Sequence, residues 1–235
     1  MSEEHRIVEV QIAAPKAVVW RVLRDPAEVR NWFGWEAPSL DEEIRMIFVD
    51  GADADEAAGT IQFGEWEGTS DRFELTERGD GTLLTVVRRG TPPEGGWGVH
   101  YDEVVEGWIT FLQQLRLYVE AHRGDGRRTL RLSSEAGPGA IEAVGLIGAG
   151  ETGSHFAREL SPGDRVSGEV WHWGRHQLGV TVAEWSGGLI MVGDREAGGG
   201  TALLTVYGMG DAEFAALETR WRTWWGAAYP QSSTQ

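Results

Sequence analysis

The chain has 235 residues, a formal net charge of -16 and no cysteine. This length suits one large domain or two of ordinary size. The absence of cysteine excludes disulfides, thiolate nucleophiles and zinc sites built on sulfur. Acidic residues dominate and no basic stripe stands out, which argues against nucleic acid and against anionic membrane surfaces as partners.

No apolar run approaches the roughly 20 residues that a membrane-spanning helix needs. The polar segment from Met1 to Arg6 lacks the basic and then apolar order of a signal peptide, so we expect a cytoplasmic protein. Lys16 is the only lysine among 21 basic residues, a bias typical of a GC-rich bacterial genome. The 12 tryptophans are an unusually large aromatic content for cores or apolar pockets.

The first half of the chain predicts a mixed order of strands and helices. Residues 6–13 carry β-branched residues in loose alternation, which favours a strand, and Pro15 suits the first turn of a short helix. From Trp108 onward, apolar residues recur in steps of three and four, which predicts a long helix over 100–122. Between them we expect a helix over 40–48, strands over 59–65, 71–77 and 82–89 with a turn at Asp80-Gly81, and a turn-rich segment over 90–98.

The second half repeats this order after a polar, glycine-bearing linker at 122–127. Gly81-Thr82-Leu83-Leu84-Thr85-Val86 resembles Gly200-Thr201-Ala202-Leu203-Leu204-Thr205-Val206, and each precedes a loop and an aromatic-bearing helix. We therefore expect two tandem copies of one fold, 1–123 and 128–230, the alternative being an unrelated α+β domain in the second half. The expected elements are a strand over 129–133, a helix over 138–147, strands over 164–173, 176–185, 188–194 and 201–207, and a helix over 211–229 capped by Asp211.

Several short motifs in the first copy carry a family resemblance. They are Pro15-Lys16-Ala17-Val18-Val19-Trp20, Asp25-Pro26, Trp32-Phe33 and Gly107-Trp108. Together they resemble the START / Bet v 1-like (SRPBCC) superfamily, in particular the branch related to the activator of the heat-shock-protein-90 ATPase. The resemblance implies an α+β helix-grip fold, in which a curved antiparallel sheet wraps a long C-terminal helix. The second copy has Arg220-Trp221 in place of the Gly-Trp pair, so its membership depends mainly on the internal repeat.

The resemblance also implies a cavity between sheet and helix, because members of this superfamily bind hydrophobic or aromatic small molecules and some cyclise polyketides. In the second copy a two-residue turn at Gly174-Arg175 would direct several aromatic side chains of the hairpin toward the last helix. The alternative is that these side chains only fill the core. The predicted ligand-binding residues are Trp20, Trp32, Phe33, Phe63, Phe73, Trp108 and Leu112 in the first copy and Trp171, Trp173, His176, Trp221 and Trp225 in the second.

Other motifs predict little chemistry. Residues 148–153 match G-x-G-x-x-G, but hairpins instead of βα units follow, so a glycine-rich loop is favoured over a dinucleotide site. His172 and His176 are expected on opposite faces of their hairpin, which argues against a shared metal ion. The acidic segment 50–56 lacks the spacing of a calcium loop and is expected to be solvated.

Acid–base groups are few. A buried carboxylate at Glu65 or Glu77 would suit proton transfer, although exposure at the rim is the commoner outcome for such residues. His100-Tyr101 at the start of the long helix is the best remaining pair. We therefore expect a non-catalytic protein that binds a hydrophobic or aromatic small molecule without metal or cofactor. The alternatives are a polyketide aromatase/cyclase-like enzyme, in which His100, Tyr101 or His176 moves protons, and a chaperone-associated interaction module.

Overall fold

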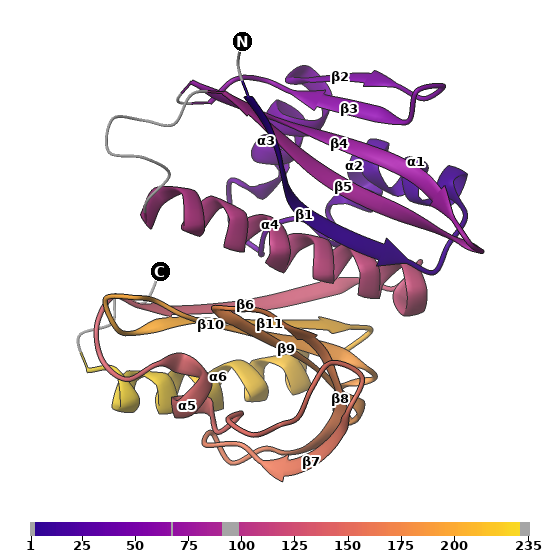
Figure 1. Ribbon diagram of the computed structural model, residues 1–235. Helices are drawn as coiled ribbons and strands as arrows, with labels where there is room; N and C mark the ends of the chain where they lie inside the picture. Colours follow the sequence, from indigo (N-terminus) through magenta and orange to yellow (C-terminus); the bar gives the residue numbers. More distant parts are fainter. Residues whose placement is uncertain (1–2, 67, 91–98, 231–235) are drawn as a thin grey trace. The chain divides into compact units, whose positions relative to one another are not determined.

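The computed structural model describes residues 3–66, 68–90 and 99–230, and for residue 3 and residues 99–103 it describes the backbone only. The chain divides into two compact units, Met1–Arg123 and Gly124–Gln235, which are called unit 1 and unit 2 below. In each unit an antiparallel sheet precedes a long C-terminal helix, so the α+β helix-grip class is as predicted (Figure 1). No helix in the described part of the chain is long and apolar enough to cross a membrane.

Unit 1 is a five-stranded antiparallel sheet in the order β1-β5-β4-β3-β2, with α4 along one face (Figure 1). Its strands are β1 (Glu3–Ile12), β2 (Ala52–Asp55), β3 (Thr60–Phe63), β4 (Thr69–Arg78) and β5 (Gly81–Gly90). Its helices are α1 (Lys16–Arg24), α2 (Pro26–Val29), α3 (Leu40–Ile44) with the π-helical η1 (Arg45–Asp50), and α4 (Val99–Leu117) with the π-helical η2 (Tyr118–His122).

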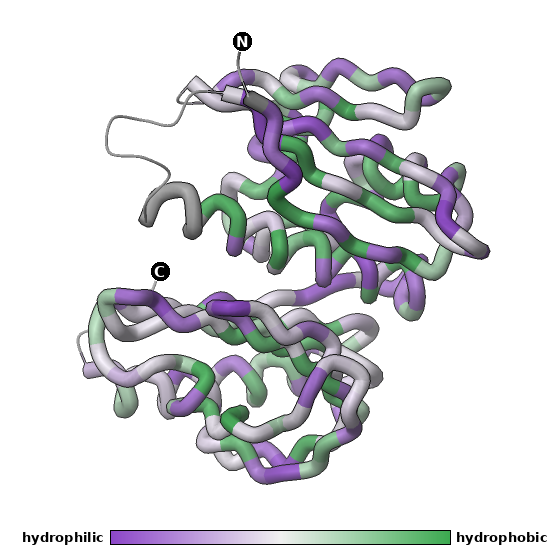
Figure 2. Tube along the Cα trace, in the orientation of Figure 1, coloured by the Kyte–Doolittle hydropathy of each residue, from purple (hydrophilic) through white to green (hydrophobic). Residues whose placement is uncertain are grey.

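Alternation along β4 and β5 decides which side chains face α4. Two residues of β4 are buried, Phe73 and Leu75, and so are Leu84 and Val86 of β5. Figure 2 shows hydrophobic residues along both strands. The predicted turn between these strands is one residue off. Arg78 pairs with Gly81, so the turn residues are Gly79, at a φ of 65°, and Asp80. Glycine at the first central position is the requirement of a type II′ turn.

The sequence analysis predicts a solvated loop for the acidic segment 50–56 and does not predict strand β2. The strand has the sequence Ala-Asp-Ala-Asp and pairs with β3 at the edge of the sheet. Aspartate is depleted in strands, but the pairing with β3 overrides that preference. Charged side chains on an edge strand also oppose pairing with another chain.

Unit 2 is a six-stranded antiparallel sheet in the order β6-β11-β10-β9-β8-β7. Its strands are β6 (Arg127–Ser134), β7 (His155–Glu159), β8 (Arg165–Trp173), β9 (Gln177–Val182), β10 (Gly188–Asp194) and β11 (Gly200–Tyr207). Its helices are α5 (Ala140–Val144), the 3-10 helix η3 (Ala183–Trp185) and α6 (Asp211–Ala228). The side chains between sheet and α6 form one apolar core that includes Trp221 and Trp225.

One detail of unit 2 agrees with the sequence prediction and two differ from it. The glycine-rich segment 148–153 leads into strand β7 and not into a helix, so it lacks the helix N-terminus that a dinucleotide site requires. Helix α6 is capped by Gly210, while the Asp211 carboxylate pairs with Arg128 at 2.6 Å. The β8–β9 turn lies one residue later than predicted, because the Gly174 amide donates to the Gln177 carbonyl at 2.8 Å.

Candidate functional site

Aromatic rings from several elements of unit 1 meet between the sheet and α4. We call this group the aromatic cluster; it consists of Trp32, Phe33, Trp35, Phe48, Phe63, Phe73, Trp108 and Phe111. Most of its ring pairs are edge-to-face or tilted, the geometries that aromatic quadrupoles favour. One apolar core therefore includes side chains from the loop that follows α2, from η1, from two strands and from α4.

Trp108 is the centre of the cluster. Its ring centroid lies 4.9 Å from that of Phe73 and 5.9 Å from that of Phe63. Exposure rises across the cluster, because Phe73 is fully buried while Trp108 and Phe111 are half-buried. The cluster thus extends from the core of unit 1 to the surface beside the middle of α4.

A charged network underlies Trp108. The Arg88 guanidinium of β5 donates through Nε and Nη2 to the two carboxylate oxygens of Asp71, at 2.7 and 2.6 Å. The Trp108 indole Nε1–H donates to Asp71 Oδ2 at 2.7 Å. Only 4% of the Arg88 side chain and 12% of the Asp71 side chain are exposed. The ion pair is bidentate, the strongest geometry for arginine and a carboxylate, and it ties α4 to the sheet.

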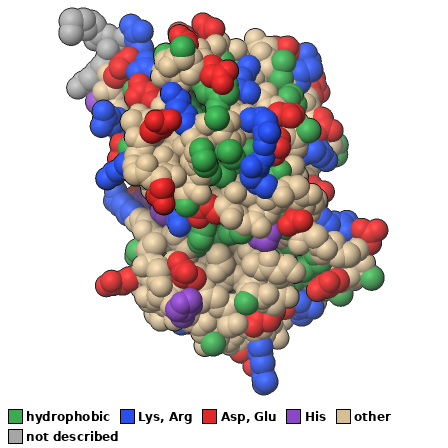
Figure 3. Space-filling model, turned by 90° about the vertical axis from the view of Figure 1, so that its right-hand side faces the viewer, with side chains coloured by type: hydrophobic (Ala, Val, Ile, Leu, Met, Phe, Trp, Pro, Cys, Tyr) green, Lys and Arg blue, Asp and Glu red, His purple; other side chains and the backbone are tan. Residues whose placement is uncertain are grey.

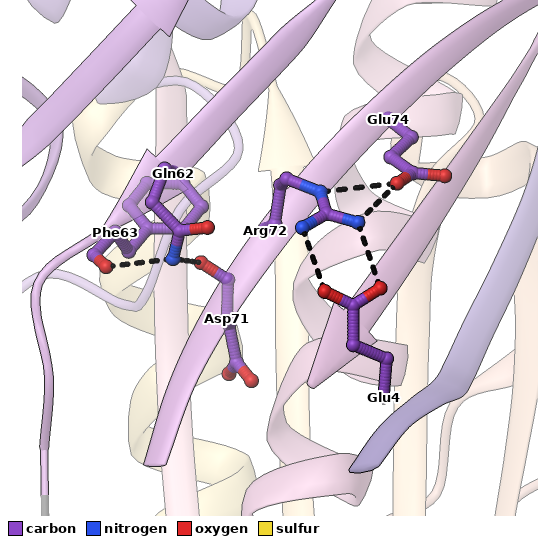
Figure 4. Close-up of polar contacts among 6 residues, drawn as sticks. All are labelled: Glu4, Gln62, Phe63, Asp71, Arg72 and Glu74. Carbon is purple, nitrogen blue, oxygen red and sulfur yellow. Dashed lines mark hydrogen bonds and ion pairs between the residues drawn. The ribbon is translucent and has the colours of Figure 1, made fainter. Parts of the chain in front are cut away.

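The neighbouring polar groups keep Asp71 in place. Gln62 Nε2 donates to the backbone oxygens of Asp71 and Phe63, both at 3.1 Å. Figure 4 shows the side chains of Asp71 and Arg72 leaving β4 on different sides, as expected for adjacent strand residues. Arg72 bonds to Glu4 and Glu74 on the outer face, and its hydrogen bond and charge lower the pKa of Glu4.

The structure brings together most of the residues predicted for the first copy. Trp32, Phe33, Phe63, Phe73 and Trp108 are members of the aromatic cluster. Two others are buried: Leu112 on α4 and Trp20 on α1. That any of them contacts a ligand stays a prediction.

Sequence reasoning missed the charged pair of the site. It weighed burial of Glu65 and Glu77 against exposure at the rim, and the structure shows both exposed. The signal for the pair was the strand alternation itself. Asp71 precedes the inward-facing Phe73 by two positions, and Arg88 follows the inward-facing Val86 by two. Because Asp71 and Arg88 pair across the β4–β5 ladder, the two registers together predict an inward ion pair.

Unit 2 contains a related network. Asp164, in the turn between β7 and β8, accepts from the Trp221 indole at 2.9 Å and from Arg220 Nε at 3.2 Å. In both units a tryptophan of the long helix therefore donates to an aspartate, which belongs to a strand in unit 1 and to a turn between strands in unit 2. The arginine differs, since Arg220 comes from the helix and its side chain is 40% exposed.

The predicted ligand residues of the second copy do not all face α6. Trp221 and Trp225 lie in the core, but Trp173 is 49% exposed and Trp171 lies where the pairing of β8 shifts between Val170 and His172. The shift is typical of a β-bulge, which changes the face of the following residues. The side chains of His100 and Tyr101 lie outside the described residues.

His176 is a central residue of the β8–β9 turn instead of a member of the inward strand face. The structure therefore does not place it in the row of Leu178, Val180 and Val182 that packs toward α6. The sequence analysis assumed a turn at Gly174-Arg175, both for the faces of the two histidines and for the aromatic side chains directed toward α6. The turn residues are Arg175 and His176, because Gly174 pairs with Gln177.

Charged side chains of both signs are interspersed on the face shown in Figure 3, with small hydrophobic patches among them. No single-signed stripe is visible on that face. Among the residues the structure describes, no group of three or more histidine, aspartate or glutamate side chains has the geometry to hold a metal ion.

Comparison with known proteins finds solved structures that match all or half of this chain at low identity. DynU16, from the dynemicin biosynthetic locus, is 20% identical over 97% of this chain and 96% of its own, with a TM-score of 0.31. CalU16 from Micromonospora echinospora is 19% identical over 51% of this chain and 85% of its own, with a TM-score of 0.34. An AHSA1-like protein from Rhizobium etli is 23% identical over 51% and 83%, also with a TM-score of 0.34.

No family profile matches the chain. No curated protein matches it either. The similarities to solved structures, at these identities and scores, assign no activity to the chain.

Proposed function

We propose that unit 1 binds a hydrophobic or aromatic small molecule between its sheet and α4, without chemical conversion of that molecule. The observation that carries this proposal is the aromatic cluster that continues from the core to half-buried Trp108 and Phe111. Flat rings of this kind offer large apolar contact area, and ligand sites are predominantly apolar with a few placed polar groups.

The polar component of the proposed site is the Asp71–Arg88 pair. The two charges neutralise each other, and Trp108 occupies a further acceptor position on Asp71. A ligand beside Trp108 would meet a compensated network instead of a single charge. This composition favours a neutral or weakly polar aromatic molecule over a strongly ionic one.

A binding titration tests the proposal with the neutral fluorophore N-phenyl-1-naphthylamine. We expect saturable binding to the full chain with energy transfer from tryptophan. Phe111→Ala removes a half-buried ring of the cluster and should weaken binding at least about fivefold, because a buried aromatic side chain contributes about 1.5–3 kcal/mol. Trp66→Ala is the matched control, since Trp66 is 71% exposed and should change affinity less than twofold.

Absence of saturable binding would overturn the proposal, as would equal losses in the two variants. Mass spectrometry of the recovered probe and of polyketide-like aromatic ketones distinguishes binding from catalysis. Unchanged masses are expected; loss of water from a polyketide analogue would favour the cyclase-like alternative.

A further inference from the structure

Four tryptophans and one tyrosine of unit 2 form a continuous row of rings, which we call the tryptophan chain. Trp221, Trp224 and Trp225 lie on α6 at the three- and four-residue spacing of one helix side, and Tyr229 directly follows the helix. The ring centroids are 6.2 Å apart for Trp185 and Trp221 and 5.9 Å apart for Trp221 and Trp224. They are 5.7 Å apart for Trp224 and Trp225 and 4.4 Å apart for Trp225 and Tyr229.

The chemistry of these rings suits the transfer of single electrons. In a protein without cysteine, indole and phenol rings are the side chains that lose one electron most readily. An electron passes between two rings through overlap of their π orbitals, so transfer is fast between packed rings and slow across saturated side chains. All four neighbouring pairs lie at distances typical of packed aromatic rings. An electron vacancy formed on one ring can therefore reach the others.

Trp224 is the ring of the tryptophan chain that an oxidant in solution can reach. It is half-buried, whereas the other four members are buried, with Trp221 fully inaccessible to solvent. A one-electron oxidant that stays outside the core therefore takes its electron from Trp224. The neighbouring Trp221 can then refill Trp224 and carry the vacancy itself.

Trp221 has a carboxylate that stabilises its oxidised form. Its Nε1–H donates to Asp164 Oδ2 at 2.9 Å, and the Asp164 side chain is only 10% exposed. Loss of an electron makes the indole cationic, and an uncompensated charge in an apolar core is costly. The Asp164 carboxylate supplies a negative charge and also lies within the distance at which a base accepts a proton.

Trp225 and Tyr229 lack a group of this kind. No described residue accepts the hydrogen of Trp225 Nε1, so a cation there would be uncompensated. The Tyr229 hydroxyl donates to the Pro138 carbonyl at 3.1 Å. A backbone carbonyl is too weak a base to take the proton that a tyrosyl radical must lose. The vacancy is therefore more stable on Trp221 than on either of these rings.

We propose that unit 2 has a redox activity, in which the tryptophan chain passes one electron from Trp221 through Trp224 to a diffusing one-electron oxidant, such as an oxyl radical or an oxidised metal complex. The oxidant gains the electron, and the Trp221 Nε1 proton moves to the Asp164 carboxylate, which leaves a neutral indolyl radical. A reductant of the enediol or thiolate class returns one electron by the same route, and the proton moves back to Nε1. This activity requires no bound ligand in unit 1.

Unit 1 supplies the comparison residue for a test. Trp32 is as fully buried as Trp221, but it donates to the Val22 carbonyl and its ring contacts are with Phe33 and Phe48. Phenylalanine is not oxidised by oxidants of this strength, so Trp32 has neither the redox-active neighbour nor the carboxylate. Burial alone therefore predicts equal protection of Trp32 and Trp221, whereas the proposal predicts a difference.

The test exposes the full chain in aerated buffer to flash-generated tris(bipyridine)ruthenium(III) and locates oxygenated tryptophans by peptide mass spectrometry. We expect about tenfold more oxygenation at Trp221 than at Trp32, the effect of one hydrogen bond to a charged group. Trp224→Phe removes the entry ring, and Asp164→Asn removes the base; each should lower oxygenation at Trp221 about tenfold. Trp173→Phe removes a 49% exposed tryptophan outside the chain and should not lower it.

Equal oxygenation of Trp221 and Trp32 would overturn the proposal, and so would unchanged oxygenation of Trp221 in Trp224→Phe. Transient absorption gives a second readout, because neutral and cationic indolyl radicals and tyrosyl radicals have different visible spectra. A final tyrosyl spectrum that disappears in Tyr229→Phe would also overturn the proposal. If a variant does not fold, the comparison of Trp221 with Trp32 in the unmodified chain decides alone. Loss of N-phenyl-1-naphthylamine binding in unit 1 leaves these outcomes unaffected, so the two proposals fail separately.

Discussion

Replacing Asp71 by asparagine should strongly destabilise unit 1. The carboxylate accepts two hydrogen bonds from Arg88 and one from Trp108, and the Arg88 side chain is only 4% exposed. The variant keeps the shape of the side chain but removes the charge that compensates the guanidinium. Removing one partner of a buried ion pair costs about 3–5 kcal/mol. Since a domain is stable by about 5–15 kcal/mol, this is a large fraction of the total.

Two comparisons make the magnitude diagnostic. Asp164→Asn in unit 2 changes a similar aspartate whose arginine is 40% exposed, so solvent screens the loss and we expect about 1 kcal/mol. The double change Asp71→Leu with Arg88→Met removes both charges and should cost far less than Asp71→Asn alone, because hydrophobic replacement of a buried pair is often neutral.

The assay is urea unfolding of the full chain, combined with hydrogen exchange to report the free energy of each unit separately. Exchange is needed because a chain with two compact units need not unfold in one transition. Protection should fall in β4, β5 and α4 and stay unchanged in unit 2. A loss below about 1 kcal/mol for Asp71→Asn would refute the reasoning, since the pair would then behave as a solvated one.

Three further predictions concern other parts of the chain. The Tyr229 phenol should titrate near pH 12, seen as the part of the tyrosinate absorbance at 295 nm that is absent in Tyr229→Phe. Its folded pKa is raised above the unfolded value, so its contribution to stability is complete below about pH 10 and is lost as the pH rises toward 12; an ordinary tyrosinate titration would contradict this. Gln114→Leu should cost about 1–3 kcal/mol in urea unfolding, because it removes the donor to the Trp32 and Gly34 carbonyls in a fully buried site; a neutral effect would mean that water replaces the amide. Gly79→Ala should cost about 1 kcal/mol at its φ of 65°, with Gly107→Ala, at a helical glycine, as the stabilising or neutral counterpart.

Local pattern was sufficient to predict the main elements of this protein. The three- and four-residue spacing after Trp108 predicted α4, and period-two alternation predicted the strands that became β4 and β5. These patterns can be recognised within one segment, because the buried face of a helix or strand must be apolar and its residues recur at the period of that element. The fold class followed from their order together with the motifs of the family resemblance.

Errors occurred where pairing between strands overrides local preference. The acidic β2 and the short β7 have little strand character of their own and exist because a neighbouring strand offers hydrogen-bond partners. Both misplaced hairpin turns were errors of one residue. Only the complete ladder fixes that register, and a bulge in β8 then turned Trp173 away from the core.

The sequence by itself determined which stretches are amphipathic, and through them the order of sheets and helices and most of the tryptophans that would be buried. Tertiary structure decided the hydrogen-bond acceptors of those tryptophans. Trp108 donates to Asp71 and Trp221 donates to Asp164, and no described residue accepts from the Trp225 indole. The physical reason is that the two kinds of interaction differ in how many residues must be correctly placed. Apolar burial acts on every residue of a face, whereas a hydrogen bond depends on two atoms from distant segments meeting within about 3 Å.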